Sequence, residues 1–220
     1  MWQHVHERLG LWDGQAEEYW RRYRAGEIDY AEFCRLDASH WAGVPEAQAR
    51  SFADELPYNP GVPAGLRALR ALGRPIVLVS TGLTLLTDRI VREFELDAAF
   101  TNHLAVSADG LLTGEADVRV QDGAKGHVLD RVTARFGVEP ARMVAVGDSY
   151  NDVDVAQRVG WFVAYRCSSD DESDQIPTGG AEERIETRCT LREDGEADGP
   201  NSEVGEHGQG SKSCPERRSG

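Results

Sequence analysis

The first 56 residues carry apolar and aromatic side chains at intervals of three or four residues. Trp2, Val5 and Leu9 begin this pattern, and Phe33 and Leu36 continue it. Such spacing places apolar side chains on one face of a helix, so it predicts amphipathic helices without a strand. The aromatic residues have two interpretations, packing in the core of a small helical subdomain or stacking on a ligand. Periodic aromatic residues usually pack, so the spacing favours the core.

From Pro57 onward, short apolar runs alternate with helical periodicity. The run Ile76–Val79 lies between breakers and predicts a strand buried on both faces of a parallel sheet. The dipeptide Asp109-Gly110 predicts a hairpin between two short apolar segments. This alternation predicts a doubly wound parallel α/β sheet preceded by a helical insertion. The predicted strands lie at 76–79, 98–101, 143–146 and 161–165, and the predicted helices at about 66–72, 84–94, 126–136 and 151–159.

Charge divides the chain into two unequal parts. Residues 1–166 carry a net charge of −6, and residues 167–220 carry the remaining −8 of the total of −14. The second part also has few large apolar side chains, so its composition predicts a disordered acidic tail. We therefore predict a helical cap at 1–58, an α/β core at 59–166 and the tail at 167–220.

The composition excludes several classes of function. An acidic chain lacks the basic surface with which proteins attract nucleic acid. No segment approaches eighteen consecutive apolar residues, so no membrane-spanning helix is predicted. The N-terminus lacks the pattern of a secretory signal. These features predict a cytoplasmic protein with no nucleic-acid or membrane partner, and they do not indicate its oligomeric state.

Polar side chains gather where the predicted strands end. Ser80 and Gly82 follow one strand, Asp148 follows another, and Lys125 precedes a helix. Ligands of open parallel sheets bind beyond these carboxyl ends. For a phosphate ester with bound Mg²⁺, Ser80 and the N–H groups around Gly82 would donate to phosphoryl oxygens, and Lys125 would neutralise developing charge. Asp148 would ligate the metal, and Asp152, in the following helical turn, would hold the metal's waters.

Each of these residues also has a simpler interpretation. Ser80 and its neighbours would cap the next helix, and Lys125 would be a solvated surface charge. Asp148 or Asp152 would cap the helix that follows them. Four such residues at the ends of successive elements, in one chain order, favour a common site.

Three segments resemble the motifs of the haloacid dehalogenase-like superfamily of phosphatases, in its phosphoserine phosphatase-like branch. Leu78–Gly82 is similar to the second motif, Ala124–Gly126 to the third and Val146–Asp152 to the fourth. The hairpin at Asp109–Gly114 and the segment Gly26–Tyr30 also resemble this branch. The resemblance covers about residues 1–166. It implies a HAD-like α/β fold and Mg²⁺-dependent hydrolysis of a small phosphorylated metabolite through an aspartyl-phosphate intermediate.

The resemblance also implies a role for individual residues. Ser80, Thr81, Gly82 and Lys125 would bind the phosphate, and Ser80 and Lys125 would be catalytic. Asp148 and Asp152 would hold the metal, Asp152 through its waters, and Asn151 would support them.

The sequence departs from the family pattern at its first motif. That motif is an Asp-x-Asp pair after the opening strand, and it supplies the nucleophile and the general acid/base. The sequence has an Asp-x-Asp only at 152–154, inside the fourth motif. The strand that carries the first motif would be central, so we expect a gap between the strands at 76 and 143. We hypothesise a truncated start and a shifted reading frame after about residue 166. The alternatives are a catalytically inactive phosphate- or metal-binding protein and a gene remnant that does not fold stably.

The cap also departs from the pattern of phosphoserine-specific relatives. In those relatives a cap Arg grips the substrate carboxylate, whereas Asp37 aligns with that position in this sequence. Arg35 lies nearby but is expected on another face of the helix. The resemblance therefore does not identify the substrate.

Overall fold

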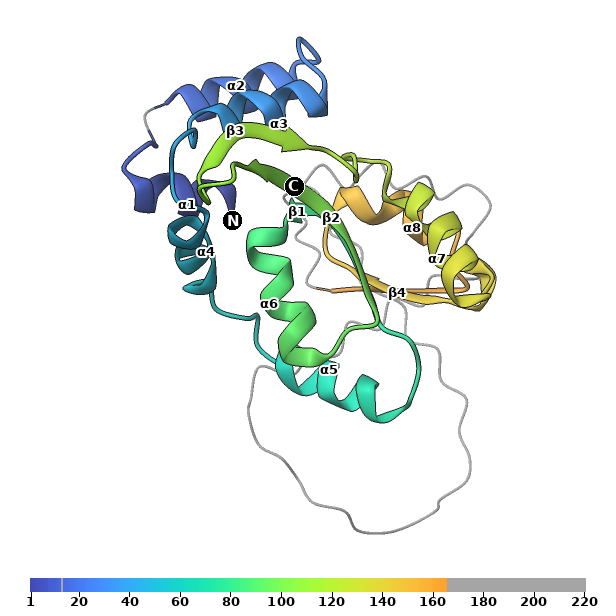
Figure 1. Ribbon diagram of the computed structural model, residues 1–220. Helices are drawn as coiled ribbons and strands as arrows, with labels where there is room; N and C mark the ends of the chain where they lie inside the picture. Colours follow the sequence, from blue (N-terminus) through green and yellow to red (C-terminus); the bar gives the residue numbers. More distant parts are fainter. Residues whose placement is uncertain (13, 166–220) are drawn as a thin grey trace, which may run out of the picture. The chain divides into compact units, whose positions relative to one another are not determined.

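The computed structural model of this protein describes residues 1–12 and 14–165 (Figure 1). The predicted tail at 167–220 lies outside the described residues. Within the described ranges, every helix is too short or too polar to cross a bilayer.

The N-terminal part of the chain is helical, as the apolar spacing predicts (Figure 1). Gly10 ends the first helix with φ of 71°, a left-handed conformation that glycine adopts without a steric penalty. Asp29 begins the third helix, because its carboxylate accepts a hydrogen bond of 2.8 Å from the Glu32 N–H. The four helices are α1 (Trp2–Leu9), α2 (Gln15–Arg24), α3 (Tyr30–Ser39) and α4 (Glu46–Asp54).

Helices and strands alternate through the rest of the described chain, and the predicted strands are confirmed. The predicted hairpin is also confirmed, with Gly110 at φ of 76° in its turn. The elements are α5 (Val62–Ala71), β1 (Val77–Leu83), α6 (Thr84–Phe94), β2 (Ala98–Val106), β3 (Leu112–Asp117), η1 (Lys125–His127), α7 (Val128–Phe136), η2 (Pro140–Arg142), β4 (Val144–Gly147), η3 (Tyr150–Asp152), α8 (Val153–Ala156) and β5 (Trp161–Ala164).

The predicted helix at 151–159 is wrong in its length. The α-helical part is only α8, and a 3₁₀ turn, η3, precedes it. The chain turns after α8 so that the Gly160 N–H reaches the carbonyl oxygens of Pro140 and Met143, each at 3.1 Å. This long-range anchor shortens the helix and begins β5.

The strands form two separate sheets. One has the order β1-β2-β3, with β1 parallel to β2 and β2 antiparallel to β3, and the other pairs β4 with β5 in parallel. Helix α6 contacts β1 and β2, and α3 contacts β3 (Figure 1). Because β1 and β4 are not paired in the described residues, the gap expected between the strands at 76 and 143 is present.

The first strand differs from its prediction in length and burial. Pairing with β2 runs in register from Val77 to Val79 and resumes at Leu83, which pairs with Asn102. Residues 80–82 therefore bulge out of the ladder, and the strand continues beyond the predicted end. Most of β1 is half-buried instead of buried on both faces, because the edge of β1 away from β2 carries no strand in the described residues.

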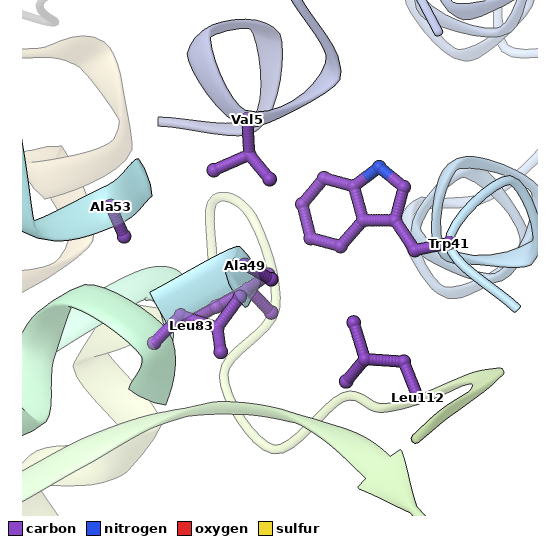
Figure 2. Packing of buried hydrophobic residues seen from close by; sticks show 7 residues of the cluster. Val5, Trp41, Ala49, Ala53, Leu83 and Leu112 are labelled. Atoms are coloured by element: carbon purple, nitrogen blue, oxygen red, sulfur yellow. The ribbon is translucent and has the colours of Figure 1, made fainter. Parts of the chain in front are cut away.

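The largest buried cluster joins the N-terminal helices to the sheet. Figure 2 shows the Trp41 indole, fully buried, beside Val5, with Leu112 of β3 and Leu83 of β1 in the same space. Two alanines of α4, Ala49 and Ala53, and Leu85 of α6 complete the cluster. Burial of this much apolar surface stabilises the junction, so α1 and α4 share a core with the end of β1.

The second sheet leaves one face exposed within the described part of the chain. Along β4 and β5, exposed residues alternate with half-buried ones, as a strand's side-chain period of two requires. The inner side chains pack against a small cluster of Leu129, Val155 and Val159. The outer apolar side chains are Val144, Val146, Trp161 and Val163.

Candidate functional site

Lys125 and Asp152 form the centre of the candidate site. Lys125 Nζ donates to Asp152 Oδ1 at 2.8 Å, and each side chain is only 12% exposed. Their elements, η1 and η3, contact each other, and η1 also contacts β1. The interpretation of Lys125 as a solvated surface charge is therefore wrong, because the ammonium is partly buried in an ion pair.

The second carboxylate oxygen of Asp152 shapes the turn after β4. Oδ2 accepts hydrogen bonds from the N–H groups of Asp148 at 3.2 Å and Ser149 at 3.4 Å. Asp152 stands at the N-terminal boundary of α8, but its side chain makes no capping hydrogen bond to that helix. It instead binds backward to the turn and across to Lys125, so the simple capping interpretation fails for this residue.

Gly147 has no side chain, and the Asp152 carboxylate occupies the space that a Cβ at position 147 would need. A Cβ at position 147 would lie 2.5 Å from Asp152 Oδ2 and 2.6 Å from its Cγ. We expect Gly147→Ala to lower the free energy of unfolding by about 1–3 kcal/mol, since a packed side chain must move. The substitution should also weaken the ion pair between Lys125 and Asp152.

Urea unfolding of both Gly147→Ala and Gly65→Ala tests this requirement. Gly65 lies in α5, and a Cβ there meets nothing within 4 Å. Because alanine favours helix over glycine, the control should gain about 0.5–1 kcal/mol. Equal stabilities of Gly147→Ala and the wild type would show that Asp152 does not need this space.

The bulge of β1 carries Ser80, Thr81 and Gly82. The Thr81 carbonyl oxygen accepts hydrogen bonds from Tyr30 Oη at 3.1 Å and from Asn102 Nδ2 at 2.9 Å. In a trans peptide the N–H points away from the carbonyl oxygen, so the Gly82 N–H lies on the side opposite the Thr81 carbonyl oxygen. This N–H donates to Ser80 Oγ at 3.0 Å. These contacts orient the hydroxyl and the backbone N–H together.

Helix α6 begins without a cap from this segment. Its N-cap is Leu83, and no side chain caps it. Ser80 instead accepts from Gly82 within the bulge. The interpretation of Ser80-Thr81-Gly82 as a helix cap is therefore wrong.

Asn102 is a positioning residue that sequence reasoning missed. It is 1% exposed, and its Oδ1 accepts from the N–H groups of Arg119 and Val120, each at 2.8 Å. Its Nδ2 donates to the carbonyl oxygens of Thr81 and Val120. It therefore ties the β1 bulge to the segment that leads to Lys125. A lone Asn within an apolar strand, preceding a hairpin, was the available signal.

Asp154 is a second residue that the sequence did not single out for the site. The Gly126 N–H donates to Asp154 Oδ2 at 2.5 Å, and Arg158 donates to the Gly126 carbonyl oxygen. A Cβ at position 126 would lie 3.0 Å from the Asp154 backbone oxygen. Glycine is thus needed next to Lys125 for the close approach of α8.

Asp148 and Asn151 lie in the segment between β4 and α8. Asp148 is exposed at the end of β4, and Asn151 lines a cavity with Thr81 and Gly82. In the ranges that the structure describes, no three His, Cys, Asp or Glu side chains are grouped as metal ligands. Asp148 and Asp152 are two carboxylates at one turn, and Mg²⁺ is commonly held by one or two carboxylates together with several waters.

The cavity has a volume of about 600 Å³ and extends from the β1 bulge to the N-terminal helices. Thr81, Gly82 and Asn151 form one end of its lining. Aromatic side chains from α1, α2 and α3, and the Trp12 side chain between α1 and α2, form much of the rest. Two of the residues beside it have shifted acidities: burial raises the pKa of the Tyr30 hydroxyl, and burial together with the hydrogen bond to Asp122 raises the pKa of Tyr23.

Asp37 reaches the cavity from a fully buried polar network. Trp41 Nε1 donates to His6 Nδ1 at 3.1 Å, and an indole N–H can only donate. The proton of His6 therefore sits on Nε2, which donates to Asp37 Oδ1 at 2.8 Å. His6 is 0% exposed and Asp37 2%. The network holds the Asp37 carboxylate in one orientation.

The sequence of this chain is similar to those of known proteins. The family model of haloacid dehalogenase-like hydrolases matches residues 2–160. The phosphoserine phosphatase of Idiomarina loihiensis is 37% identical over 128 residues, which cover 58% of this chain and 58% of that protein. The phosphoserine phosphatase of Albidiferax ferrireducens is 33% identical over 151 residues, covering 66% of this chain and 63% of that protein. The chain thus spans less than two thirds of the length of these relatives.

The fold also matches a solved structure. The crystal structure of a probable phosphoserine phosphatase from Vibrio cholerae superposes with a TM-score of 0.68 at 28% sequence identity. The match covers 76% of this chain and 52% of that one. It includes helical and α/β parts, as the predicted fold class requires.

Proposed function

Because the chain belongs to the haloacid dehalogenase-like hydrolases, in the phosphoserine phosphatase-like branch, we propose that it carries the phosphate- and metal-binding residues of a Mg²⁺-dependent phosphomonoesterase. The observation that carries this proposal is the partly buried pair of Lys125 and Asp152. This pair joins the third and fourth motif segments at the carboxyl ends of the strands. We retain the division into a cap at 1–58 and a core at 59–166 as part of the proposal.

The phosphate would bind between the β1 bulge and Lys125. Ser80 Oγ and the Thr81 N–H would donate hydrogen bonds to phosphoryl oxygens. The Gly82 N–H, which donates to Ser80 Oγ, would orient that hydroxyl toward the phosphate. Lys125 would supply the positive charge that offsets the charge on the phosphoryl group during transfer. The hydrogen bonds to the Thr81 carbonyl oxygen support this role, since they hold the bulge in one conformation.

Mg²⁺ would bind beside Asp148. The donor set fits this ion, because Mg²⁺ takes oxygen ligands and keeps several waters when one or two carboxylates hold it. Asp148 would ligate directly, Asp152 would orient the metal's waters while it pairs with Lys125, and Asn151 would support the turn. When bound, the ion would neutralise phosphoryl charge and orient the phosphate.

The substrate would be a small phosphorylated metabolite, in keeping with the relatives named phosphoserine phosphatase. Hydrolysis through an aspartyl-phosphate needs an Asp nucleophile in addition to the residues above. A second candidate function is a catalytically inactive phosphate- and metal-binding protein. The observation that favours it is that Asp152, in the Asp-x-Asp pair at 152–154, is held by Lys125.

Calorimetric titration with inorganic phosphate tests the proposed binding site. We expect Mg²⁺ to tighten phosphate binding by roughly tenfold or more, because the ion neutralises phosphoryl charge. Asp148→Asn should remove this Mg²⁺ dependence, and Asp109→Asn, in the exposed hairpin turn, should keep it. No phosphate binding by the wild type, or equal Mg²⁺ dependence in Asp148→Asn, would contradict the proposal.

The same preparations separate the two candidate functions. Phosphate release from p-nitrophenyl phosphate with Mg²⁺ is measured for the 220-residue chain and for Asp148→Asn. Turnover that Asp148→Asn abolishes would establish the enzyme. Phosphate binding without turnover would establish the inactive binding protein for this chain.

A further inference from the structure

The cavity beside the β1 bulge is lined by aromatic and acidic side chains. Aromatic rings form much of its wall, and acidic side chains form most of its charge. Among the described residues that line it, none is Lys or Arg. The five aromatic residues of the lining are Trp2, Trp12, Trp20, Tyr30 and Phe33.

The aromatic wall reaches solvent at Trp20. This side chain is 49% exposed, and the Arg24 guanidinium lies over its ring, 5.7 Å from the centroid. Its ring centroid lies 5.8 Å from that of Phe33, and Phe33 lies 6.2 Å from Tyr30. The rings thus form a continuous surface on α2 and α3. The faces of such rings attract cations, and several of them together bind ammonium groups well.

Three acidic residues add negative charge to the same cavity. Asp37 is 2% exposed and is held by His6, and Glu17 lies on the exposed side of α2. Asp122 accepts from Tyr23 Oη at 2.5 Å through Oδ2, while its buried Oδ1 accepts no hydrogen bond from the described residues. A buried carboxylate oxygen without a partner is costly, so this atom suits a positively charged group that arrives with a ligand.

The charged side chains in this lining are all acidic. The cavity therefore combines acids with aromatic faces. Such a site favours a cationic group and disfavours a carboxylate.

We infer that this cavity selects the cationic head group of an amino-alcohol phosphate, an ammonium without a carboxylate. The inference rests on the proposed function, because the phosphate would occupy the β1 bulge at one end of the cavity. The head group would then lie against the rings, with Asp37, Glu17 and Asp122 around its positive charge. A substrate carboxylate in the same place would meet these acids, so phosphoserine would bind less tightly than phosphoethanolamine.

Calorimetric titration of the full chain, with Mg²⁺ present, tests this selectivity. The probes are phosphocholine, phosphoethanolamine, O-phosphoserine, glycerol 1-phosphate, choline and inorganic phosphate. We expect phosphocholine or phosphoethanolamine to bind about tenfold more tightly than phosphoserine and glycerol 1-phosphate. Equal or tighter binding of phosphoserine, or of glycerol 1-phosphate, would overturn the inference.

Variants connect the selectivity to the cavity. Glu17→Gln and Trp20→Leu should each weaken phosphocholine binding severalfold and leave inorganic phosphate binding unchanged. Asp37→Asn should do the same, because asparagine can still accept from His6 and so keeps the buried hydrogen bond. Glu18→Gln, a neighbouring acid outside the lining, is the matched control. Unchanged phosphocholine affinity in all three lining variants would overturn the inference.

The two smallest probes separate failure of this inference from failure of the proposed function. If inorganic phosphate binds but the cationic head group adds no affinity, the head-group site is wrong and the phosphate site stands. If choline binds while inorganic phosphate does not, the head-group site stands and the proposed phosphatase function fails.

Discussion

Replacing His6 with alanine is expected to lower the free energy of unfolding by about 3–5 kcal/mol, as is usual when one partner of a buried pair is removed. His6 and Asp37 are almost completely buried, and their 2.8 Å hydrogen bond is the contact that the substitution deletes. Asp37 would then keep a buried charge without its donor, and Trp41 would lose its acceptor. Urea unfolding followed by circular dichroism measures the effect.

Two variants control for the His6 result. His4→Ala lies on the same helix, at a side chain that is 28% exposed, and should cost less than about 1 kcal/mol. Trp41→Phe removes the indole N–H and keeps most of the ring, so it should cost less than His6→Ala. If His6→Ala is as stable as His4→Ala, the buried network does not stabilise the junction of the helices and the sheet.

Lys125→Met is expected to weaken binding of inorganic phosphate by about ten- to a hundredfold, since a charge-assisted hydrogen bond contributes about 1.5–3 kcal/mol. It should also destabilise the protein, because Asp152 is 12% exposed and would lose its ion-pair partner. Titration calorimetry measures the first effect, and urea unfolding the second. Arg142→Met, at an exposed cation near β4, is the control and should leave both values unchanged.

A second substitution separates charge from geometry at this position. Lys125→Arg keeps the positive charge in a bulkier, planar group at a partly buried site. We expect Lys125→Arg to recover part of the free energy of unfolding that Lys125→Met loses. It should recover a smaller part of the lost phosphate affinity. Wild-type phosphate affinity in Lys125→Met would mean that Lys125 serves only to hold Asp152.

Local sequence pattern was sufficient for most elements of the fold. The three- and four-residue spacing in the first 56 residues predicts the helices that are present, and the run at 76–79 predicts β1. The Asp109-Gly110 pair predicts its hairpin. These features depend on backbone preferences and on side-chain period, which a few neighbouring residues determine. The gap between β1 and β4 followed from the resemblance to a family, since pairing between distant strands is not encoded locally.

Some residues of the candidate site were predictable from the sequence, but their contacts were not. Residue types at strand ends were enough to select Ser80, Lys125, Asp148 and Asp152, because topology brings the carboxyl ends of parallel strands together. Their partners were not readable from the sequence. Asp152 binds Lys125 across 27 residues, and the sequence pattern indicated only a metal-binding or capping role for it.

The sequence by itself determined the order and type of the elements, the strand-end polar residues and the family. Tertiary structure alone decided the bulge at residues 80–82, the role of Asn102 behind it, and the acid- and aromatic-lined cavity. It also decided that Asp37 is a buried partner of His6, 31 residues away. The physical reason is that hydrogen bonding and burial at these positions depend on residues far apart in the chain, whereas helix, strand and turn preferences act between neighbours.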